Sequence, residues 1–358
     1  MHHTKTFMAA AVGLGLLTLS ACGSSDSGSG GDSKTVTLVS HDSWAVSKSV
    51  LKDFEKQSGY TVKVLKDGDA GQAVNKAILT KDNPQGDVFF GVDNTLLSRA
   101  LDNGLFQSYD AKGSTLVKPE YRVDQTKHRV TPIDTGDICV NYDKAYFSKH
   151  KLTPPTSFAD LVKPEYKNLL VTENAATSSP GLGFLLGSAA QFGDDGWQGY
   201  WKKLKANGVK VVDGWEQAYD QEFSGSASGK KAGGDRPLVV SYASSPPAEV
   251  IYADPKPTTA PTGVSYGTCF RQTEYAGLLS NAQNTKGGKA FLDFLLTKEF
   301  QQDMPLNMFV YPVIQGAQVP QEFVKYGRQA SDPETMAPAK IAADRDQWVK
   351  SWTSLVLK

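Results

Sequence analysis

The sequence predicts an α/β fold of two domains, the first of which is built on a doubly wound parallel sheet. Strand and helix patterns alternate with short connections from residue 35 to residue 92, as they do in parallel α/β sheets. The length of 358 residues suggests two domains, at roughly 100–200 residues per domain. A composition of 40% hydrophobic and 21% charged residues is typical of an ordered globular protein.

The first predicted domain alternates between strand and helix patterns. Its expected elements are, in order, strand 35–40, a helix from Ser43 or Ser47 to Gly59, strand 60–65, a helix around 73–78 and strand 86–92. The segments that follow the three strands, 40–44, 66–69 and 93–94, are polar. Ligands collect at the carboxyl ends of strands in such sheets, so these segments indicate a binding site.

The second unit follows a proline-rich connection over 151–165. Its expected elements are strand 168–171, a helix over 184–192 that the hydroxyl-rich loop 177–183 opens, strands 209–212 and 237–240, and helices 286–300 and 337–355. The segment 224–235, SGSASGKKAGGD, has low complexity, and we expect a surface loop without packing content there.

The N-terminus reads as an export signal. Residues 1–21 contain Lys5 and an apolar run that is too short to span a bilayer. Leu19-Ser20-Ala21-Cys22 resembles the lipobox of bacterial lipoproteins, and residues 22–34 form a flexible tether. We therefore expect lipidation at Cys22 and an extracytoplasmic protein anchored to the cell membrane. The alternative is a cysteine that closes an ordinary signal peptide, and the type of envelope stays open.

Charge and motifs exclude several function classes. The 38 basic and 38 acidic residues balance, so no basic excess is available for nucleic acid. The sequence has no HExxH or GxSxG motif, and Gly181-Leu182-Gly183 lacks the third glycine of a dinucleotide fingerprint. The spacing of Asp42 and Asp134 does not require an acid–base pair. We expect no catalytic residues, no metal and no cofactor.

Two cysteines remain besides Cys22. Cys139 and Cys269 both lie in segments with strand character. In an oxidising exterior they are expected to form a disulfide, whereas the alternative is two separate buried thiols.

Aromatic residues cluster in predicted turns and strand ends beside small polar residues. They are Trp44, Trp215, Tyr219, Tyr242, Phe309 and Tyr311. Each one alone could simply pack in a core, but six of them on two units indicate a ligand cleft. Such a cleft suits a flat cationic heteroaromatic ligand through stacking and cation–π attraction. Asp67, Asp93 and Asp134 are the expected counter-charges, and Ser178 and Ser179 could bind a hydroxyl or phosphate tail.

Five segments then match a known family in its order along the chain. They are Gly91-Val92-Asp93-Asn94-Thr95-Leu96-Leu97, Thr177-Ser178-Ser179-Pro180-Gly181-Leu182-Gly183, Gly214-Trp215-Glu216-Gln217-Ala218-Tyr219, Ser241-Tyr242-Ala243-Ser244-Ser245-Pro246 and Tyr311-Pro312-Val313. The chain resembles the substrate-binding proteins of bacterial thiamine ABC transporters, which have the type II periplasmic binding-protein fold. The resemblance extends from His41-Asp42-Ser43-Trp44 to the C-terminal helix.

The resemblance implies roles for individual residues. Trp215, Tyr242 and Phe309 would sandwich the aminopyrimidine and thiazolium rings, and Ser178-Ser179 would hold the hydroxyethyl or phosphate end. His41 stands where enterobacterial members carry Tyr, and Phe309 where they carry Trp. The set of expected ligand-binding residues is completed by His41, Asp42, Asn94 and Ser245. Whether thiamine, its monophosphate or its diphosphate is preferred stays open.

The resemblance implies two lobes, which are two doubly wound α/β domains joined by hinge-crossing strands. Residues 35–135 with about 270–305 would form the N-terminal lobe, and residues 136–269 with about 306–358 the C-terminal lobe. The strands that bear Cys139 and Cys269 would cross the hinge. A monomer would capture the ligand, close around it without breaking a bond, and dock onto an ABC permease. The alternatives are the same fold binding another small cation or a metal complex, and an exported thiamine-cleaving enzyme with Cys139 as nucleophile.

Overall fold

The computed structural model describes residues 33–358, so the predicted signal peptide, Cys22 and the tether up to residue 32 lie outside the described part. The strands of this part are β1 Thr35–Ser40, β2 Thr61–Lys66, β3 Val88–Asp93, β4 Thr131–Asp143, β5 Leu170–Glu173, β6 Lys210–Val212, β7 Leu238–Tyr242, β8 Thr262–Leu278 and β9 Tyr311–Pro312. Its α-helices are α1 Lys48–Ser58, α2 Ala70–Leu79, α3 Leu97–Asp102, α4 Lys144–Lys149, α5 Ser179–Ala206, α6 Trp215–Gln217, α7 Ala227–Ala232, α8 Ala248–Ile251, α9 Thr285–Leu295, α10 Lys298–Asn307, α11 Gln321–Tyr326 and α12 Pro338–Trp352.

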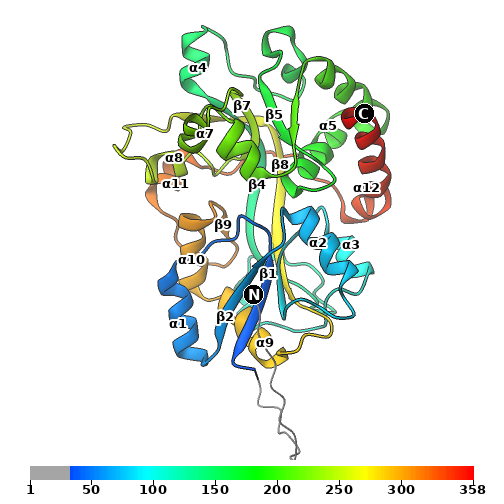
Figure 1. Cartoon of the computed structure of the whole chain (residues 1–358), viewed down its shortest axis with the longest axis vertical. Coiled ribbons are helices and arrows are strands. Elements are labelled where there is room, and N and C mark those ends of the chain that lie inside the picture. The colour runs from blue at the N-terminus through cyan, green and yellow to red at the C-terminus, as the bar shows by residue number, and fades with distance from the viewer. Residues whose placement is uncertain (1–32) are drawn as a thin grey trace, which may run out of the picture. The chain divides into compact units, whose positions relative to one another are not determined.

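The strands form one mixed sheet with the path β2-β1-β3-β8-β4-β7-β5-β6, and β9 pairs with β4. β1 is parallel to β2 and β3, and β5 is parallel to β6 and β7. The long strands β4 and β8 are antiparallel to each other and to β7 and β3. Figure 1 shows β4 and β8 running through both lobes, with β1 and β2 in one and β5 and β7 in the other. The predicted two-lobed α/β fold with hinge-crossing strands is therefore confirmed.

Local sequence signals explain where the helices begin and end. Gly59 closes α1 with a φ of 72°, a left-handed conformation that glycine adopts without a Cβ penalty. Helix α5 was expected over 184–192 but continues to Ala206. Gly193, with a φ of 71°, kinks α5 immediately after the expected end without terminating it.

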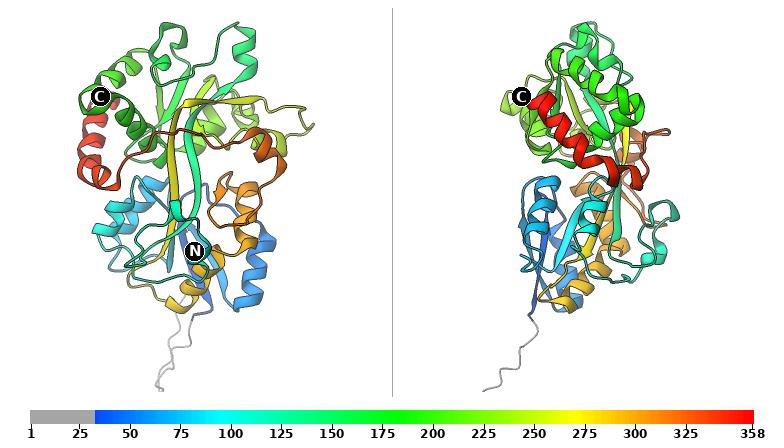
Figure 2. Two further views of the ribbon diagram at one scale, coloured as in Figure 1. Left: turned by 180° about the vertical axis from the view of Figure 1, so that it is seen from behind. Right: turned by 90° about the vertical axis from the view of Figure 1, so that its right-hand side faces the viewer.

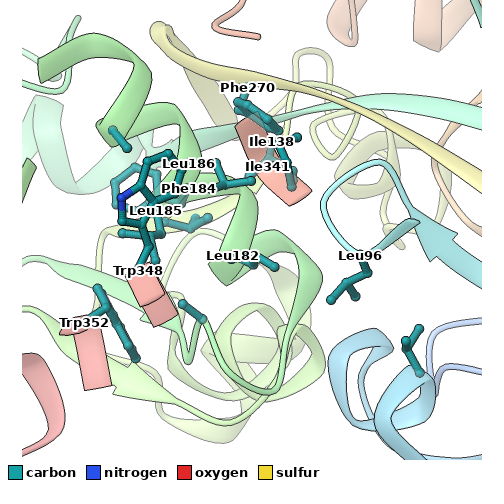
Figure 3. Close-up of a cluster of buried hydrophobic side chains, with 14 of the residues drawn as sticks. Leu96, Ile138, Leu182, Phe184, Leu185, Leu186, Phe270, Ile341, Trp348 and Trp352 are labelled. Atoms are coloured by element: carbon teal, nitrogen blue, oxygen red, sulfur yellow. The ribbon is translucent and has the colours of Figure 1, made fainter. Parts of the chain in front are cut away.

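The core of the second lobe joins the C-terminal helix to α5. Figure 3 shows Leu182, Leu185 and Leu186 of α5 near Trp348 and Trp352 of α12. Trp352 is completely buried, and its ring meets Trp201 edge-on with centroids 5.4 Å apart. Figure 2 shows α12 lying along the second lobe from two further directions. Large apolar side chains at helical spacing therefore fix the end of the chain to this lobe.

One predicted boundary is wrong. We expected the chain to belong to the second lobe from about residue 306, but Val310, Val313 and Ile314 pack in the hydrophobic core of the first lobe. In addition, Tyr311–Pro312 pairs as β9 with Asp134–Thr135 of β4. The physical reason is that this short apolar run fills space beside α10, which the sequence pattern alone does not reveal.

The segment 224–235 also differs from its prediction. It contains α7, and Ser226 caps this helix by accepting a hydrogen bond from the Gly229 N–H at 2.9 Å. Ser226 is fully buried and donates to the Tyr219 carbonyl oxygen at 2.6 Å. A Cβ at Gly229 would lie 2.0 Å from the Phe223 carbonyl oxygen, so only glycine allows this close packing. The segment lies at the surface as expected, with Ala227, Ser228 and 230–233 exposed, but its buried small residues pack densely, which we had not expected.

A disulfide joins the two hinge strands. Cys139 of β4 and Cys269 of β8 are bonded, and their Cα atoms lie 4.2 Å apart. The ladder between β4 and β8 is irregular between Ile138 and Val140, next to this bond. Along residues 33–358, no helix has both the length and the hydropathy needed to cross a bilayer.

Candidate ligand-binding cleft

Two adjoining cavities lie where the carboxyl ends of β1 and β2 meet the N-terminus of α5 and the turn after β6. The inner cavity has a volume of about 50 Å³, which is well below the range of roughly 300–1,000 Å³ typical of small-molecule sites. Its walls are His41, Ser43, Asp69, Ala70, Ser179, Pro180, Trp215, Tyr242, Ser245, Glu274, Met308, Phe309 and Val310. The adjoining outer cavity has a volume of about 440 Å³, which is within that range, and it shares the wall residues Ser43, Trp215, Ser245, Met308 and Phe309 with the inner one, so the two together form the candidate cleft. Both lobes contribute to each cavity.

Asp69 connects the two lobes beside the inner cavity. It caps α2 of the first lobe by accepting a hydrogen bond from Ala70 N–H at 2.6 Å. Its other oxygen accepts from Trp215 N–H of the second lobe at 2.8 Å, and Ser179 N–H lies 3.4 Å from the first oxygen. Gln72 N–H also donates across the lobes to the Thr177 carbonyl oxygen at 3.0 Å. One carboxylate thus contacts both sides of the cleft and holds them together.

Glu274 supplies a second carboxyl group on the wall of the inner cavity. It lies in β8 opposite Asp134 of β4, and both side chains are buried. Burial, and the neighbouring Asp134, raise the pKa of Glu274 well above its ordinary value. Burial likewise raises the pKa of Asp134 to about 7, although Asp134 itself does not reach the wall.

More buried carboxyl groups stand behind this wall. Burial raises the pKa of Asp93 to about 6 and that of Glu173 well above its ordinary range. His41 Nε2 lies 3.5 Å from Glu274 Oε1, but burial and the charge of Lys66 lower the pKa of His41 to about 4. The imidazole is therefore neutral at pH 7 and does not compensate the carboxyl groups. The inner cavity is a site that favours a cation.

Aromatic rings from both lobes form the flat walls. In the second lobe, the Trp215 indole stacks on Tyr219 with centroids 5.0 Å apart and planes 14° apart. Its Nε1–H donates to Ser241 Oγ at 2.9 Å, which fixes the orientation of the ring. Because Tyr219 covers one face of the indole, the other face is available to a ligand. Tyr242 lies at an angle to it, with centroids 6.5 Å apart.

The facing wall from the first lobe is Phe309. Its ring stacks on Phe323 with centroids 6.1 Å apart, and Tyr252 meets it edge-on at 5.7 Å. The backbone of Phe309 has a φ of 56°, an unusual conformation for a residue with a large side chain. Such strained positions are found preferentially at ligand sites.

The wall of the outer cavity has more acidic than basic side chains. Among residues 33–358, Lys66 is the one basic residue on this wall, and Asp42, Glu216, Asp220 and Glu249 are acidic. Glu249 accepts hydrogen bonds from Tyr219 O–H at 3.1 Å and Ala227 N–H at 2.8 Å. The remaining carboxylates make the mouth of the cleft negative, so that it attracts cations.

The structure brings many of the expected ligand-binding residues to the cavity walls. These are His41, Asp42, Trp44, Ser179, Trp215, Tyr219, Tyr242, Ser245 and Phe309. Other expected residues line neither cavity: Asp67, Asp93, Asn94, Asp134, Ser178 and Tyr311.

Each expected residue that lines neither cavity makes another contact in the structure. Asp67 pairs with Lys76 of α2 at 2.6 Å, and Asp93 accepts from Thr95 and Gln272 inside the protein. Asn94 hydrogen-bonds the backbone of β8 at Arg271 and Thr273. The other three lie just behind the wall: the Ser178 hydroxyl faces Asp69, Tyr311 packs edge-on against Phe323, and Asp134 adjoins Glu274. The carboxyl groups that line the inner cavity are thus those of Asp69 and Glu274, and the expected Asp67, Asp93 and Asp134 lie outside its wall.

Sequence reasoning missed several wall residues. They are Ser43, Lys66, Asp69, Glu216, Asp220, Glu249, Glu274 and Met308. Asp69 could have been found, because it ends the polar segment 66–69 and precedes a helix as an N-cap residue. Glu274 carries no such signal, since its position depends on the pairing of β8 with β4.

Comparison with known proteins places the chain among bacterial transport proteins. Residues 83–235 match the family model described as bacterial extracellular solute-binding protein. The thiamine-binding periplasmic protein of Escherichia coli K12 is 30% identical over 90% of this chain and 93% of its own length. That of Haemophilus influenzae is 26% identical over 91% and 93%.

Solved structures agree with this placement. A periplasmic thiamin binding protein superposes with a TM-score of 0.78 and 26% identity, covering 90% of this chain and 96% of that one. A ferric binding protein from Campylobacter jejuni superposes with a TM-score of 0.70 at 18% identity, which shows a shared fold. With its two-lobed fold and its cation-favouring cleft, the chain belongs to the family of the thiamine-binding periplasmic proteins.

Proposed function

We propose that this protein captures thiamine in the cleft between its lobes and delivers it to an ABC permease. Thiamine consists of a flat aminopyrimidine and a positively charged thiazolium ring. One observation carries the proposal: Trp215 and Phe309, from opposite lobes, border the same cavity as the carboxyl groups of Asp69 and Glu274. Aromatic faces and carboxylates together stabilise a flat cation through stacking, cation–π attraction and charge neutralisation.

The positions of Phe309 and Trp215 on opposite lobes explain why ligand binding would close the cleft. A ligand that contacts Phe309 of the first lobe and Trp215 of the second binds the closed arrangement better than an open one, and so shifts the population towards it. The closed form is the one that a permease would recognise. We propose a monomer for this role.

The proposed activity is binding without chemistry. The relatives are named as binding proteins, and the thiamine-cleaving alternative depended on Cys139 as nucleophile. In the structure the Cys139 sulfur is bonded to Cys269, so it is not available as a thiolate. Among residues 33–358 there is no group of three or more His, Cys, Asp or Glu side chains suited to a metal ion. Incubation with thiamine should release no pyrimidine.

The proposed cellular location has two parts, a place outside the cytoplasm and a lipid anchor. The relatives are periplasmic proteins, which supports a place outside the cytoplasm. The lipid anchor on Cys22 is a further proposal that depends on the lipobox-like sequence before it.

Calorimetry with Trp215 variants tests the proposal. Trp215→Ala should weaken thiamine binding more than tenfold, because cation–π and stacking contacts on a desolvated ligand contribute on the order of 2 kcal/mol. Trp215→Phe keeps a flat ring and should lose less. An unchanged affinity of Trp215→Ala, or wild-type protein that gives no heat with thiamine, would contradict the proposed function.

A further inference from the structure

Two carboxyl groups lie against each other between the hinge strands. Asp134 of β4 and Glu274 of β8 are register partners, so their side chains leave the sheet side by side. The exposed fractions are 1% and 7%, and the carboxyl groups are within hydrogen-bonding reach of each other. Glu274 borders the inner cavity, and Asp134 lies behind it.

The groups around this pair offer it no compensating cation. Asp93 faces it from β3 and Asp69 from the start of α2, and both are acidic. His41, from the segment after β1, is neutral, and the Tyr242 hydroxyl faces it from β7. Arg345 of α12 attracts Asp93 from a distance. In the part of the chain from 33 to 358, no lysine or arginine forms an ion pair with Asp134 or Glu274.

Elementary electrostatics then fixes the protonation state. Two buried carboxyl groups in contact cannot both be ionised near neutral pH, because each negative charge disfavours the other and neither is solvated. A hydrogen bond between them also requires a proton, because two carboxylates can only accept. In the ligand-free protein the pair therefore keeps one shared proton, and its titration belongs to both groups together.

We propose that capture of the cationic ligand expels this proton, so that uptake of thiamine is coupled to proton release at the Asp134–Glu274 pair. The inference rests on the proposed function for the identity of the ligand. The step is a simple dissociation: the O–H bond of the carboxylic acid breaks, the electron pair stays on the oxygen, and the proton passes to the buffer. The positive ring then faces a pair that carries two negative charges.

Calorimetry in two buffers measures the released proton directly. Thiamine is titrated into the purified protein at pH 7.0 in phosphate and in Tris, which differ strongly in ionisation enthalpy. We expect the observed enthalpies to differ in proportion to about 0.5–1 proton released for each thiamine bound. Equal enthalpies in both buffers together with normal binding would overturn the inference and leave the proposed function intact.

Two variants separate the pair from other groups. Asp134→Asn does not alter the cavity wall and can donate a hydrogen bond to an ionised Glu274, so thiamine should still bind with a proton release close to zero. Asp82→Asn, at an exposed side chain that lines neither cavity, should keep the wild-type value. Proton release that persists in Asp134→Asn would contradict the assignment to this pair.

A measurement without ligand keeps the inference testable if thiamine fails to bind. Infrared difference spectroscopy between the wild type and Asp134→Asn at pH 7 should show a carboxylic acid C=O band in the wild type alone. The absence of that band would show that the pair holds no proton, and would refute the inference independently of thiamine.

Discussion

Replacing Asp69 by alanine should open the cleft and weaken thiamine binding. The Asp69 carboxylate accepts from Trp215 N–H across the lobes at 2.8 Å, with a weaker contact to Ser179 N–H at 3.4 Å. A hydrogen bond to a charged group contributes about 1.5–3 kcal/mol. Because the hydrogen bond from Trp215 N–H joins the two lobes, its loss destabilises the closed form. A change of about 1.4 kcal/mol in the free energy of binding changes the affinity tenfold. We therefore expect Asp69→Ala to bind thiamine about 10- to 100-fold more weakly.

Asp67 provides a matched control two residues earlier in the same segment. Its carboxylate pairs with Lys76 at 2.6 Å and lines neither cavity. Calorimetry should show Asp67→Ala within twofold of the wild type, and Asp69→Asn, which retains one acceptor oxygen but no charge, between the two. Thermal melts of each variant would separate unfolding from a loss of binding. An Asp69→Ala affinity within threefold of the wild type would refute the role of Asp69 in holding the two lobes together.

Four further predictions concern the charge, pH dependence, hinge and anchor of the protein. Because the outer cavity has four acidic residues and Lys66 alone as a basic one, thiamine should bind more tightly than its monophosphate, and the monophosphate more tightly than the diphosphate; calorimetry giving the reverse order would contradict this charge argument. The pKa of Asp134 is raised to about 7, so carboxyl groups near the inner cavity gain protons as the pH falls, and thiamine affinity should decrease by up to about tenfold per pH unit below pH 7; a flat affinity between pH 5 and 7 would count against it. Replacing Cys139 and Cys269 together by alanine should lower the free energy of unfolding by about 2–5 kcal/mol in urea titrations, because the bond closes a loop with a sequence separation of 130; an unchanged midpoint would argue that the bond adds no stability. Cys22→Ala should abolish lipid attachment and move the protein from the membrane to the soluble fraction, as mass spectrometry and fractionation can show; an acylated variant would exclude Cys22 as the anchor.

The sequence predicted the sheet better than it predicted the site. Strand 35–40 was expected at its observed bounds, and strand 60–65 is shifted by one residue, because β-branched runs between turn residues are a local signal. The length of α5 was underestimated at both ends, since the helix begins at Ser179 within the expected loop and continues past the kink at Gly193 to Ala206. The small residues of 224–235 were misread because their value lies in the neighbours against which they pack.

The aromatic walls were accessible to sequence reasoning, whereas the carboxylates were not. Trp215 occurs in a short motif with a family pattern, Phe309 lies two residues before another, and the structure places both at the inner cavity. Glu274 reaches the same cavity through the pairing of β8 with β4, which joins residues 140 positions apart. Long-range register of this kind leaves no trace in a local pattern, so the sequence pointed to Asp134, the partner of Glu274, in its place.

A crystal structure of the protein with thiamine tests the central claim most directly. We expect the intact vitamin in the cleft that the two cavities form, with its rings between Trp215 and Phe309 and its positive charge facing Glu274 and Asp69. Thiamine bound elsewhere, a cleaved ligand, or a cavity that stays unoccupied at saturating thiamine would contradict the account.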